Sequence, residues 1–184
     1  MKKNLLLTLS VVMFFSLIVK SQIYTSKTNE ISFFSDGPVE DIAASCKSGQ
    51  ILLNTAKNEF AVKVTIKAFD FDKQLMQEHF NEKYMESDKY PYATFTGKII
   101  DPINYSKDGT YKVDVTGKLN MHGVEKERTI PCNVIIKGGE ITVDTKFIVA
   151  LKDHNIEVPS LVAQNVAETV EVTVKMTLIP FKQK

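Results

Sequence analysis

The sequence carries no excess of charge of either sign. Its 184 residues include 23 Lys and Arg against 22 Asp and Glu, which gives a formal net charge of +1 with histidine neutral. A nucleic-acid-binding domain requires a basic face, and a strongly acidic chain tends to remain disordered. The charge balance therefore argues against nucleic acid as a partner and against a disordered chain.

Long hydrophobic runs are missing except at the N-terminus. Residues 1–21 place two lysines before an apolar run from Leu5 to Val19, and the segment Val19-Lys20-Ser21 then offers small side chains at about the positions that a signal peptidase reads. This order is typical of a secretory signal peptide, and the run is shorter than the roughly 20 residues of a membrane span, although a membrane anchor is the alternative. We expect residues 1–21 to be a cleaved signal peptide. Residues 22–184 would then form one exported domain, periplasmic or secreted, with no membrane span.

Cysteine is scarce, and the chain contains only Cys46 and Cys132. Both share parity with apolar neighbours in strand-like runs, and cysteine behaves as a small hydrophobe in a protein core. This position favours two free, buried thiols. An oxidising compartment would also permit a disulfide between them, so that alternative stays open.

The sequence patterns of common catalytic and metal sites are absent. There is no Gly-x-Ser-x-Gly elbow, and Gly138-Gly139 is not followed by the Lys and Ser or Thr of a phosphate-binding loop. His79, His122 and His154 are far apart, and none has the i, i+4 partner of a zinc-binding helix. We therefore expect no catalytic residue, no metal and no cofactor, and we interpret the protein as a non-enzyme.

What the sequence does contain is a regular alternation of apolar and polar residues. In residues 59–69, 111–119 and 169–178, Val, Ile, Phe and Leu alternate with Lys, Thr, Asp and Glu. A period of two is typical of strands with one buried face and one exposed face. Turn signals separate the runs, and Gly138-Gly139 predicts a tight hairpin. The pattern predicts eight or nine strands in an antiparallel barrel or sandwich.

One charged segment, residues 69–91, interrupts the alternation. Asp72 is a favourable N-cap, and Pro91 ends the segment because its ring disfavours a helical conformation of the residue before it. We expect one or two short helices here, followed by a strand. One helical face would carry Leu75, Met76, His79 and Phe80.

Eight antiparallel strands that share one apolar face can close into a barrel, and closure removes exposed strand edges. Such a barrel is either filled by its own side chains or holds one small ligand, and both alternatives fit the alternation. The residues that would face inward are almost uncharged, so a cavity would accept a hydrocarbon chain and reject ions. The expected cavity wall consists of Phe33, Val62, Val64, Ile66, Phe95, Val113, Val115, Leu119, Val143, Phe147, Val172 and Val174.

The mouth of such a cavity would lie near the predicted helix and two loops. Met76 and Phe80 could cover it from the helix, and His122 and His154 belong to the loop segments 121–125 and 153–159. We expect the polar head of a bound amphiphile near these loops.

Several segments of the chain resemble the YceI-like family. They are a Tyr-Pro-x-x-x-Phe strand at 90–95, a Gly-x-Leu-x-x-His-Gly-Val turn at 117–124 and the segment FIVALKDHNIEVP at 147–159. The resemblance extends from about Ile31 to Leu178. It implies an exported, all-β, lipocalin-like barrel of eight antiparallel strands. It also implies a long hydrophobic cavity that binds polyisoprenoid chains or similar amphiphilic lipids.

The sequence thus predicts an exported protein that holds a long-chain isoprenoid or other amphiphilic lipid in an apolar barrel cavity. One alternative is an enzyme that acts on a small apolar substrate in the same cavity, which would need convergent polar groups inside the barrel. Another is a solid-barrel stress-response or interaction protein that works through its outer surface. An exposed strand edge could also support a homodimer.

Overall fold

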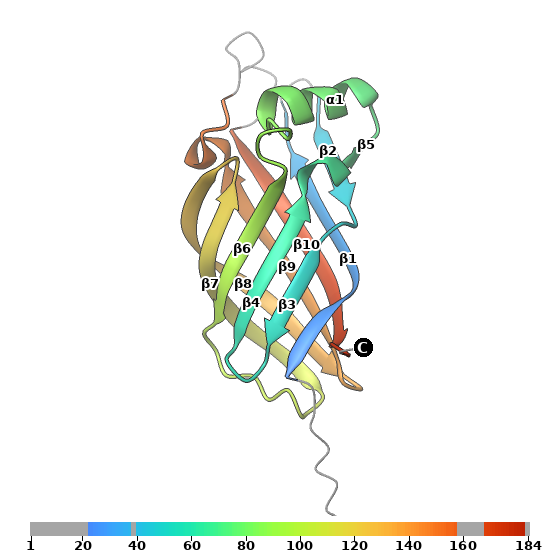
Figure 1. Cartoon of the computed structure of the whole chain (residues 1–184), viewed down its shortest axis with the longest axis vertical. Coiled ribbons are helices and arrows are strands. Elements are labelled where there is room, and N and C mark those ends of the chain that lie inside the picture. Colours follow the sequence, from blue (N-terminus) through green and yellow to red (C-terminus); the bar gives the residue numbers. More distant parts are fainter. Residues whose placement is uncertain (1–21, 38–39, 158–167, 183–184) are drawn as a thin grey trace, which may run out of the picture.

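The computed structural model describes residues 22–37, 40–157 and 168–182, which form a tall β-barrel with helical segments at one end (Figure 1). We call the end that carries the helix α1 the upper end, and the end that carries the Gly138–Gly139 turn the lower end. The strands are β1 (Ile23–Ser35), β2 (Ile42–Cys46), β3 (Gln50–Asn54), β4 (Glu59–Thr65), β5 (Asp70–Phe71), β6 (Tyr92–Ile99), β7 (Gly109–Met121), β8 (Val124–Lys137), β9 (Glu140–Ala150) and β10 (Thr169–Pro180). The helical elements are η1 (Ile66–Ala68), α1 (Gln74–His79), η2 (Phe80–Tyr84) and η3 (Leu151–His154).

The sheet is antiparallel and closes on itself. Its strand order is β10-β9-β8-β7-β6-β4-β3-β1, and β1 pairs again with β10 to complete the ring. The closing pair runs from Tyr24 opposite Pro180 to Phe34 opposite Glu171. The predicted eight-stranded antiparallel barrel is therefore confirmed.

Two of the eight barrel strands are interrupted, which is why the described residues contain ten strands. β2 and β3 pair with the same strand in the same register, since Ile31 lies opposite Cys46 and Tyr24 lies opposite Leu53. The next strand is also divided into two parts, β4 and β5, which are separated by the 3-10 turn η1. β5 pairs with β2 at the upper end of the barrel.

Side chains replace backbone pairing where β2 gives way to β3. The backbone N–H of Gly49 donates to Asn29 Oδ1 over 2.8 Å, and that of Ile51 donates to Ser26 Oγ over 2.9 Å. On the other side, the N–H of Thr65 donates to Ser48 Oγ over 3.3 Å. The interruption therefore leaves these backbone donors paired, as a buried backbone requires.

Glycine is required where β6 and β7 meet, because Gly97 lies directly opposite Gly117. A Cβ atom on Gly97 would lie 2.0 Å from the carbonyl oxygen of Thr116, and one on Gly117 would lie 2.3 Å from that of Thr96. No side chain fits at such distances, so the two backbones can come this close only as glycines. The predicted hairpin at 138–139 is confirmed, since Lys137 pairs with Glu140 across it.

The helical segment differs from its prediction at the start. Asp72 does not cap the helix: α1 begins at Gln74, its N-cap residue is Lys73, and no side chain caps it. The reason is tertiary: Phe71 is held in the sheet by its pairing with Ala44, and Lys73 still has extended backbone angles, so the helix begins only at Gln74. α1 then continues into the π-helical turn η2, which ends well before Pro91.

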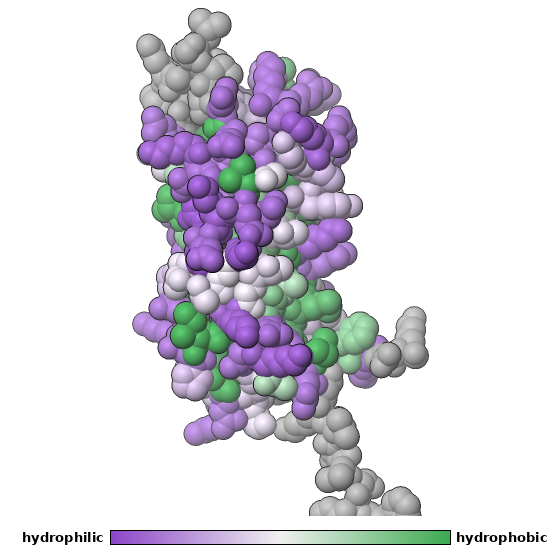
Figure 2. All heavy atoms as spheres, turned by 60° about the vertical axis from the view of Figure 1, so that its left-hand side comes forward, coloured by the Kyte–Doolittle hydropathy of each residue, from purple (hydrophilic) through white to green (hydrophobic). Residues whose placement is uncertain are grey.

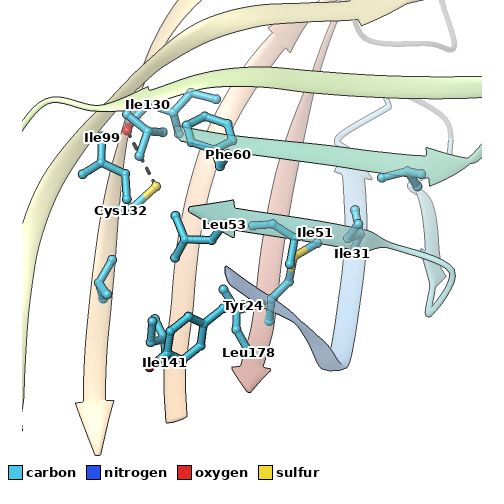
Figure 3. Close-up of a cluster of buried hydrophobic side chains, with 14 of the residues drawn as sticks. Tyr24, Ile31, Ile51, Leu53, Phe60, Ile99, Ile130, Cys132, Ile141 and Leu178 are labelled. Atoms are coloured by element: carbon cyan, nitrogen blue, oxygen red, sulfur yellow. Dashed lines mark hydrogen bonds between the residues drawn. The ribbon is translucent and has the colours of Figure 1, made fainter. Parts of the chain in front are cut away.

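The lower end of the barrel is closely packed. Leu178 and Ile141 are 0% and 1% exposed, and they lie beside Tyr24 in the cluster drawn in Figure 3. Tyr105, in the loop after β6, packs against this cluster and donates from its hydroxyl to Asn58 Oδ1 over 3.0 Å. Burial raises the pKa of Tyr105 to about 12. This loop closes the lower end as a hydrophobic plug.

The outer surface of the barrel is mostly hydrophilic, with separate hydrophobic patches on the face shown in Figure 2. Within the described residues, no helix combines the length and the hydropathy needed to cross a membrane. Cys46 and Cys132 are both free and buried, as predicted. The predicted signal peptide, residues 1–21, lies outside the described residues.

Candidate ligand-binding cavity

A cavity of about 520 Å³ lies inside the barrel, between the packed lower end and α1. Every strand contributes to its lining, and so do α1 and the two turns that flank it. The volume lies within the roughly 300–1,000 Å³ that is usual for small-molecule sites. A void of this size is not expected of a barrel filled by its own side chains.

The inward-facing side chains show where the barrel is hollow. Phe33, Val172 and Phe147 lie side by side across β1, β10 and β9 and line the cavity. All three remain partly exposed although they point into a closed barrel. Side chains at the lower end, such as Ile141, are almost fully buried. The inner surface of the upper part is therefore accessible, whereas the lower part is packed.

The predicted wall residues fall almost entirely within this lining. Val113 is the exception: it is 4% exposed and belongs to the packed core, near the lower end of β7. The predicted wall residues that line the cavity are Phe33, Val62, Val64, Ile66, Phe95, Val115, Leu119, Val143, Phe147, Val172 and Val174. Met76 and Phe80, predicted at the mouth, also line it, whereas His122 and His154 do not.

Four phenylalanines gather where the helical segment meets the barrel. The ring of Phe80 stacks on Phe33 with a centroid distance of 5.5 Å, and it contacts Phe69 at 5.7 Å and Phe71 at 5.0 Å. Aromatic pairs at such distances stabilise by about 0.5–1.5 kcal/mol beyond their buried area. This aromatic cluster fixes η2 over the upper end of the cavity.

The sequence prediction missed Phe69 and Phe71 as lining residues. Alternation along β4 places the even-numbered Val62 and Val64 inside the barrel. The 3-10 turn η1 then shifts the parity, so that the odd-numbered Phe69 and Phe71 face inward after it. A signal for this shift exists in the sequence, since both are large apolar residues separated by the charged Asp70.

The cavity reaches the surface beside α1. Among the described lining residues, only Leu75 and Glu40 are exposed, and Leu75 is 62% exposed. Leu75 belongs to α1, and Glu40 precedes β2 at the same end of the barrel. The carboxylate of Glu40 forms an ion pair with Lys73, directly before α1. The opening is therefore bordered by α1 and by the segment that leads into β2.

The lining contains few polar side chains. Thr145 is buried, and its hydroxyl donates to the carbonyl of Pro131 over 2.7 Å. Burial raises the pKa of Cys132, which keeps its thiol protonated and unreactive at neutral pH. The polar lining residues other than cysteine are Ser35, Glu40, His79, Tyr84, Thr94 and Thr145.

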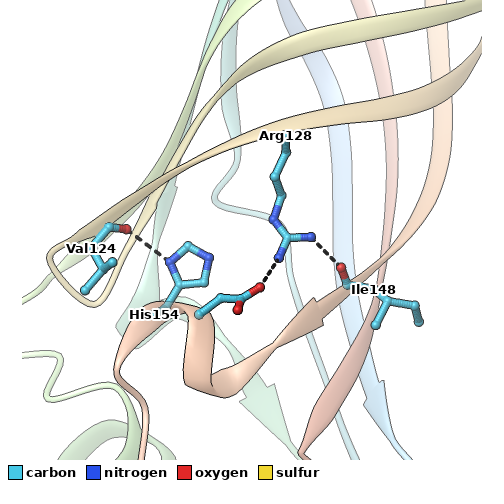
Figure 4. A network of polar contacts seen from close by, with 5 residues as sticks. Val124, Arg128, Ile148 and His154 are labelled. Atoms are coloured by element: carbon cyan, nitrogen blue, oxygen red, sulfur yellow. Dashed lines mark hydrogen bonds and ion pairs between the residues drawn. The ribbon is translucent and has the colours of Figure 1, made fainter.

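His154 is a structural residue of the upper end (Figure 4). It is 0% exposed, and its Nδ1 contacts the carbonyl oxygen of Val124 at 3.0 Å. Burial lowers the pKa of His154, and the Arg128 cation acts in the same direction, while the Val124 carbonyl opposes them. Arg128 in turn donates to the Ile148 carbonyl over 2.7 Å and pairs with Asp153 at 3.3 Å. These contacts join η3 to β8 and β9.

His122 links three loops of the same end. Its Nδ1 lies 3.1 Å from the carbonyl oxygen of His154, and its Nε2 lies 2.9 Å from Glu86 Oε2. The ring also packs edge-on against Tyr90 at 4.7 Å. Both histidines predicted at the mouth therefore hold the loops outside the cavity together.

The arrangement is suited to holding an apolar chain. Among the residues that the structure describes, no three His, Cys, Asp or Glu side chains lie close enough to bind a metal ion. The inner surface instead offers a long apolar wall that reaches the surface beside α1. A closed antiparallel barrel with an apolar internal cavity and an end that reaches the surface defines a class of small hydrophobic-ligand barrels.

The chain belongs to the YceI-like domain family, whose family model matches residues 20–178. No curated protein matches it. The predicted family is thus confirmed.

Solved structures of low sequence identity share the fold. A polyisoprenoid-binding domain from Saccharophagus degradans implicated in plant cell wall breakdown matches with a TM-score of 0.74 and 17% identity, over 88% of this chain and 100% of its own. BcnA from Burkholderia cenocepacia matches with a TM-score of 0.68 and 20% identity, over 81% and 95%. A YceI protein from Campylobacter jejuni matches with a TM-score of 0.54 and 15% identity over 100% of both chains.

Proposed function

We propose that this protein is exported and holds a long-chain amphiphilic lipid, a polyisoprenoid or a similar molecule, in its barrel cavity. The observation that carries the proposal is the apolar cavity of about 520 Å³, whose inward-facing wall stays accessible inside a closed barrel. The family and the polyisoprenoid-binding domain of Saccharophagus degradans support the choice of ligand class. The N-terminal sequence supports export, periplasmic or secreted.

Hydrophobic burial supplies the main favourable free energy for binding such a chain. Each CH₂ group removed from water contributes roughly 0.8 kcal/mol, so ten of them contribute about 8 kcal/mol before the cost of association is subtracted. The wall around Phe33, Phe147 and Val172 supplies the apolar surface without any ionic contact. We interpret the protein as a lipid-binding protein and not as an enzyme.

The proposal predicts that lipid co-purifies with the protein. The full chain should be expressed with its N-terminal segment, purified without detergent and analysed by native mass spectrometry, followed by extraction and identification of the lipid. We expect a single long-chain amphiphile in a one-to-one complex. A protein that neither carries lipid nor takes it up from isoprenoid vesicles would contradict the proposal.

A matched pair of variants tests whether the lipid binds inside the cavity. Val172→Phe fills part of the lining and should lower the amount of bound lipid several-fold, because the tail and the added ring compete for the same space. Thr173→Phe changes the next residue of β10, which alternates to the outer face, and should leave the bound amount unchanged. Equal occupancy of the two variants would argue against binding in the barrel.

A further inference from the structure

The polar side chains of the cavity lining are concentrated at its upper end. Ser35 ends β1, Glu40 lies just before β2, His79 ends α1 and Tyr84 ends η2. The lower part of the lining is formed by apolar side chains such as Leu178. The cavity therefore has a polar end and an apolar end, which match the polar head and the apolar tail of an amphiphile.

The hydroxyl of Ser35 is the most unusual group of this lining. The residue is 2% exposed and lines the cavity, yet its Oγ has no hydrogen-bond partner among the described residues. The buried hydroxyl of Thr145, by contrast, donates to the carbonyl of Pro131. A buried hydroxyl without a partner costs about 1–3 kcal/mol, and alanine would fill the same place without that cost. Packing alone therefore gives no reason for a serine at this position.

Ser35 lies beside the opening of the cavity. It is paired with Ile42, and two residues before Ile42 the carboxylate of Glu40 forms its ion pair with Lys73. This ion pair ties the start of β2 to the start of α1. The serine hydroxyl thus faces the cavity next to the segment that borders its opening.

The helical segment approaches the same place from the other side. Phe33, two residues before Ser35 on the inner face of β1, stacks on Phe80. His79, the residue before Phe80, also lines the cavity, and its imidazole has no hydrogen-bond partner among the described residues. The end of β1 and the end of α1 therefore bring a hydroxyl and an imidazole to one end of the cavity.

The described lining offers no cationic side chain for an anionic head group. No Lys or Arg belongs to the described lining, and its only carboxylate is that of Glu40. A phosphate is usually bound by cationic side chains that donate charge-assisted hydrogen bonds, and the Lys73 cation beside the opening is already paired with Glu40. A hydroxyl or carbonyl group instead matches the serine hydroxyl, which can both donate and accept.

We propose that Ser35 hydrogen-bonds the uncharged polar head, an alcohol or a carbonyl, of the bound lipid at the α1 end, while the tail extends toward Leu178. This inference rests on the proposed function and adds to it the orientation and head-group class of the ligand. It also moves the head group from the loops 121–125 and 153–159, where the sequence predicted it, to the end of β1.

Binding of three ligands of one chain length tests this inference. An isoprenoid alcohol, its phosphate ester and the parent hydrocarbon should be titrated into the full mature protein by calorimetry or native mass spectrometry, since the chain has no tryptophan to report binding. The variants are Ser35→Ala, Ser35→Thr, which keeps a hydroxyl, and Ser32→Ala as a control on the outer face of β1. Thermal unfolding of each ligand-free variant serves as the fold control.

The expected result is specific to the head group. Ser35→Ala should weaken binding of the alcohol about five- to tenfold, the effect of one hydrogen bond, and leave binding of the hydrocarbon unchanged. Ser35→Thr should retain more of the alcohol affinity, Ser32→Ala should retain all of it, and the wild type should bind the phosphate ester more weakly than the alcohol. Ser35→Ala should also unfold at an unchanged or higher temperature, because it removes an unpaired hydroxyl.

Each contrary result has a distinct meaning. Equal alcohol affinity of the wild type and Ser35→Ala, or tighter binding of the phosphate ester, would overturn the head-group inference and leave the proposed function intact. A lower unfolding temperature of Ser35→Ala, with weaker binding of all three ligands, would assign Ser35 a structural role and overturn it as well. A wild type that binds none of the three would remove the proposed function and this inference with it.

Discussion

The two ends of the barrel are built from the same alternating strands but are filled differently. At the lower end, Tyr24, Ile141 and Leu178 pack against one another, and the loop that carries Tyr105 covers them. At the upper end, inward-facing Phe33 and Val172 remain partly exposed around a cavity. The alternation of the sequence decides which side chains point inward. The segments that close each end decide whether these side chains pack against one another or line a cavity.

The segments that close the ends differ in kind. The lower end is closed by a loop whose tyrosine hydroxyl is hydrogen-bonded to Asn58, which fixes the plug in place. The upper end is covered by α1, a six-residue helix that buries none of its residues and has no side-chain cap. Short helices without caps gain little stability of their own, so α1 depends chiefly on the aromatic contacts of Phe80, the residue that follows it. The helix α1 is thus more weakly held than the loop that closes the lower end.

The largest expected effect is at the packed end. Ile141→Ala should lower the free energy of unfolding by about 2–5 kcal/mol, because it leaves a cavity among side chains that are already in contact. Ile148→Ala is the matched control on the same strand, since Ile148 is 51% exposed and should cost less than about 1 kcal/mol. Urea unfolding of both variants measures the difference. Similar losses for the two variants would contradict the assignment of Ile141 to the packed core.

A valine pair compares the two ends directly. Val113→Ala removes two methyl groups from the packed core and should cost about 2 kcal/mol. Val172→Ala removes the same atoms from a side chain that already faces the cavity and should cost less than about 1 kcal/mol. The measurement is urea unfolding of both variants without lipid. An equal cost at the two positions would mean that the upper end is as tightly packed as the lower end.

The stability of the folded protein should depend on pH through His154, which joins η3 to β8 at the upper end. The pKa of His154 is lowered from its ordinary value of 6.5 in the folded protein, chiefly by burial. The unfolded chain therefore takes up a proton first as the pH falls below about 6.5. Stability should decrease through that window until the pH drops below the lowered pKa, by about 1.4 kcal/mol for each unit of pKa difference.

Comparison of stability at pH 7.5 and pH 5.5 tests this effect. His154→Gln should have a lower free energy of unfolding at pH 7.5 and a weaker pH dependence between the two values. His79→Gln is a control, because the imidazole of His79 is only partly buried and has no hydrogen-bond partner among the residues that the structure describes. A pH dependence unchanged by His154→Gln would show that this histidine does not carry the effect.

The smallest effect is expected on the outer surface near the lower end. Lys27 and Glu140 form an ion pair at 2.5 Å, but their side chains are 49% and 42% exposed. Exposed pairs contribute about 0–1 kcal/mol, and salt screens them further. Lys27→Met should therefore change the unfolding temperature by no more than a few degrees, and less in high salt. A large loss would mean that the packed end depends on charge as well as on its apolar core.

The barrel itself could be predicted from the sequence because the direction of a side chain on a strand is a local property. Residues such as Val172 and Val174 face inward by parity alone, and the structure places both in the cavity lining. Val113 follows the same parity but lies in the packed core. An odd or even position along a strand determines whether a side chain points into the barrel. It does not determine which side chains lie across the barrel from it, so the depth of the cavity could not be predicted.

The rest of the site could not be predicted because it depends on pairings between distant segments. Phe71 enters the sheet by pairing with Ala44, which moves the start of α1 past Asp72. His122 and His154 looked like residues of a cavity mouth, but each finds its partners in loops far along the chain. Ser35 shares parity with Ile31 and Phe33, so its inward direction was predictable, whereas its unpaired hydroxyl was not.

The first and last strands have a practical consequence for experiments. β1 begins and β10 ends at the lower end, where the backbone N–H of Phe181 donates to the carbonyl of Ile23 over 2.8 Å (Figure 1). An affinity tag or a surface tether attached before Ile23 or after Phe181 therefore leaves the opposite end of the barrel facing the solution. Immobilised protein should accept lipid from a flowing sample as readily as free protein does.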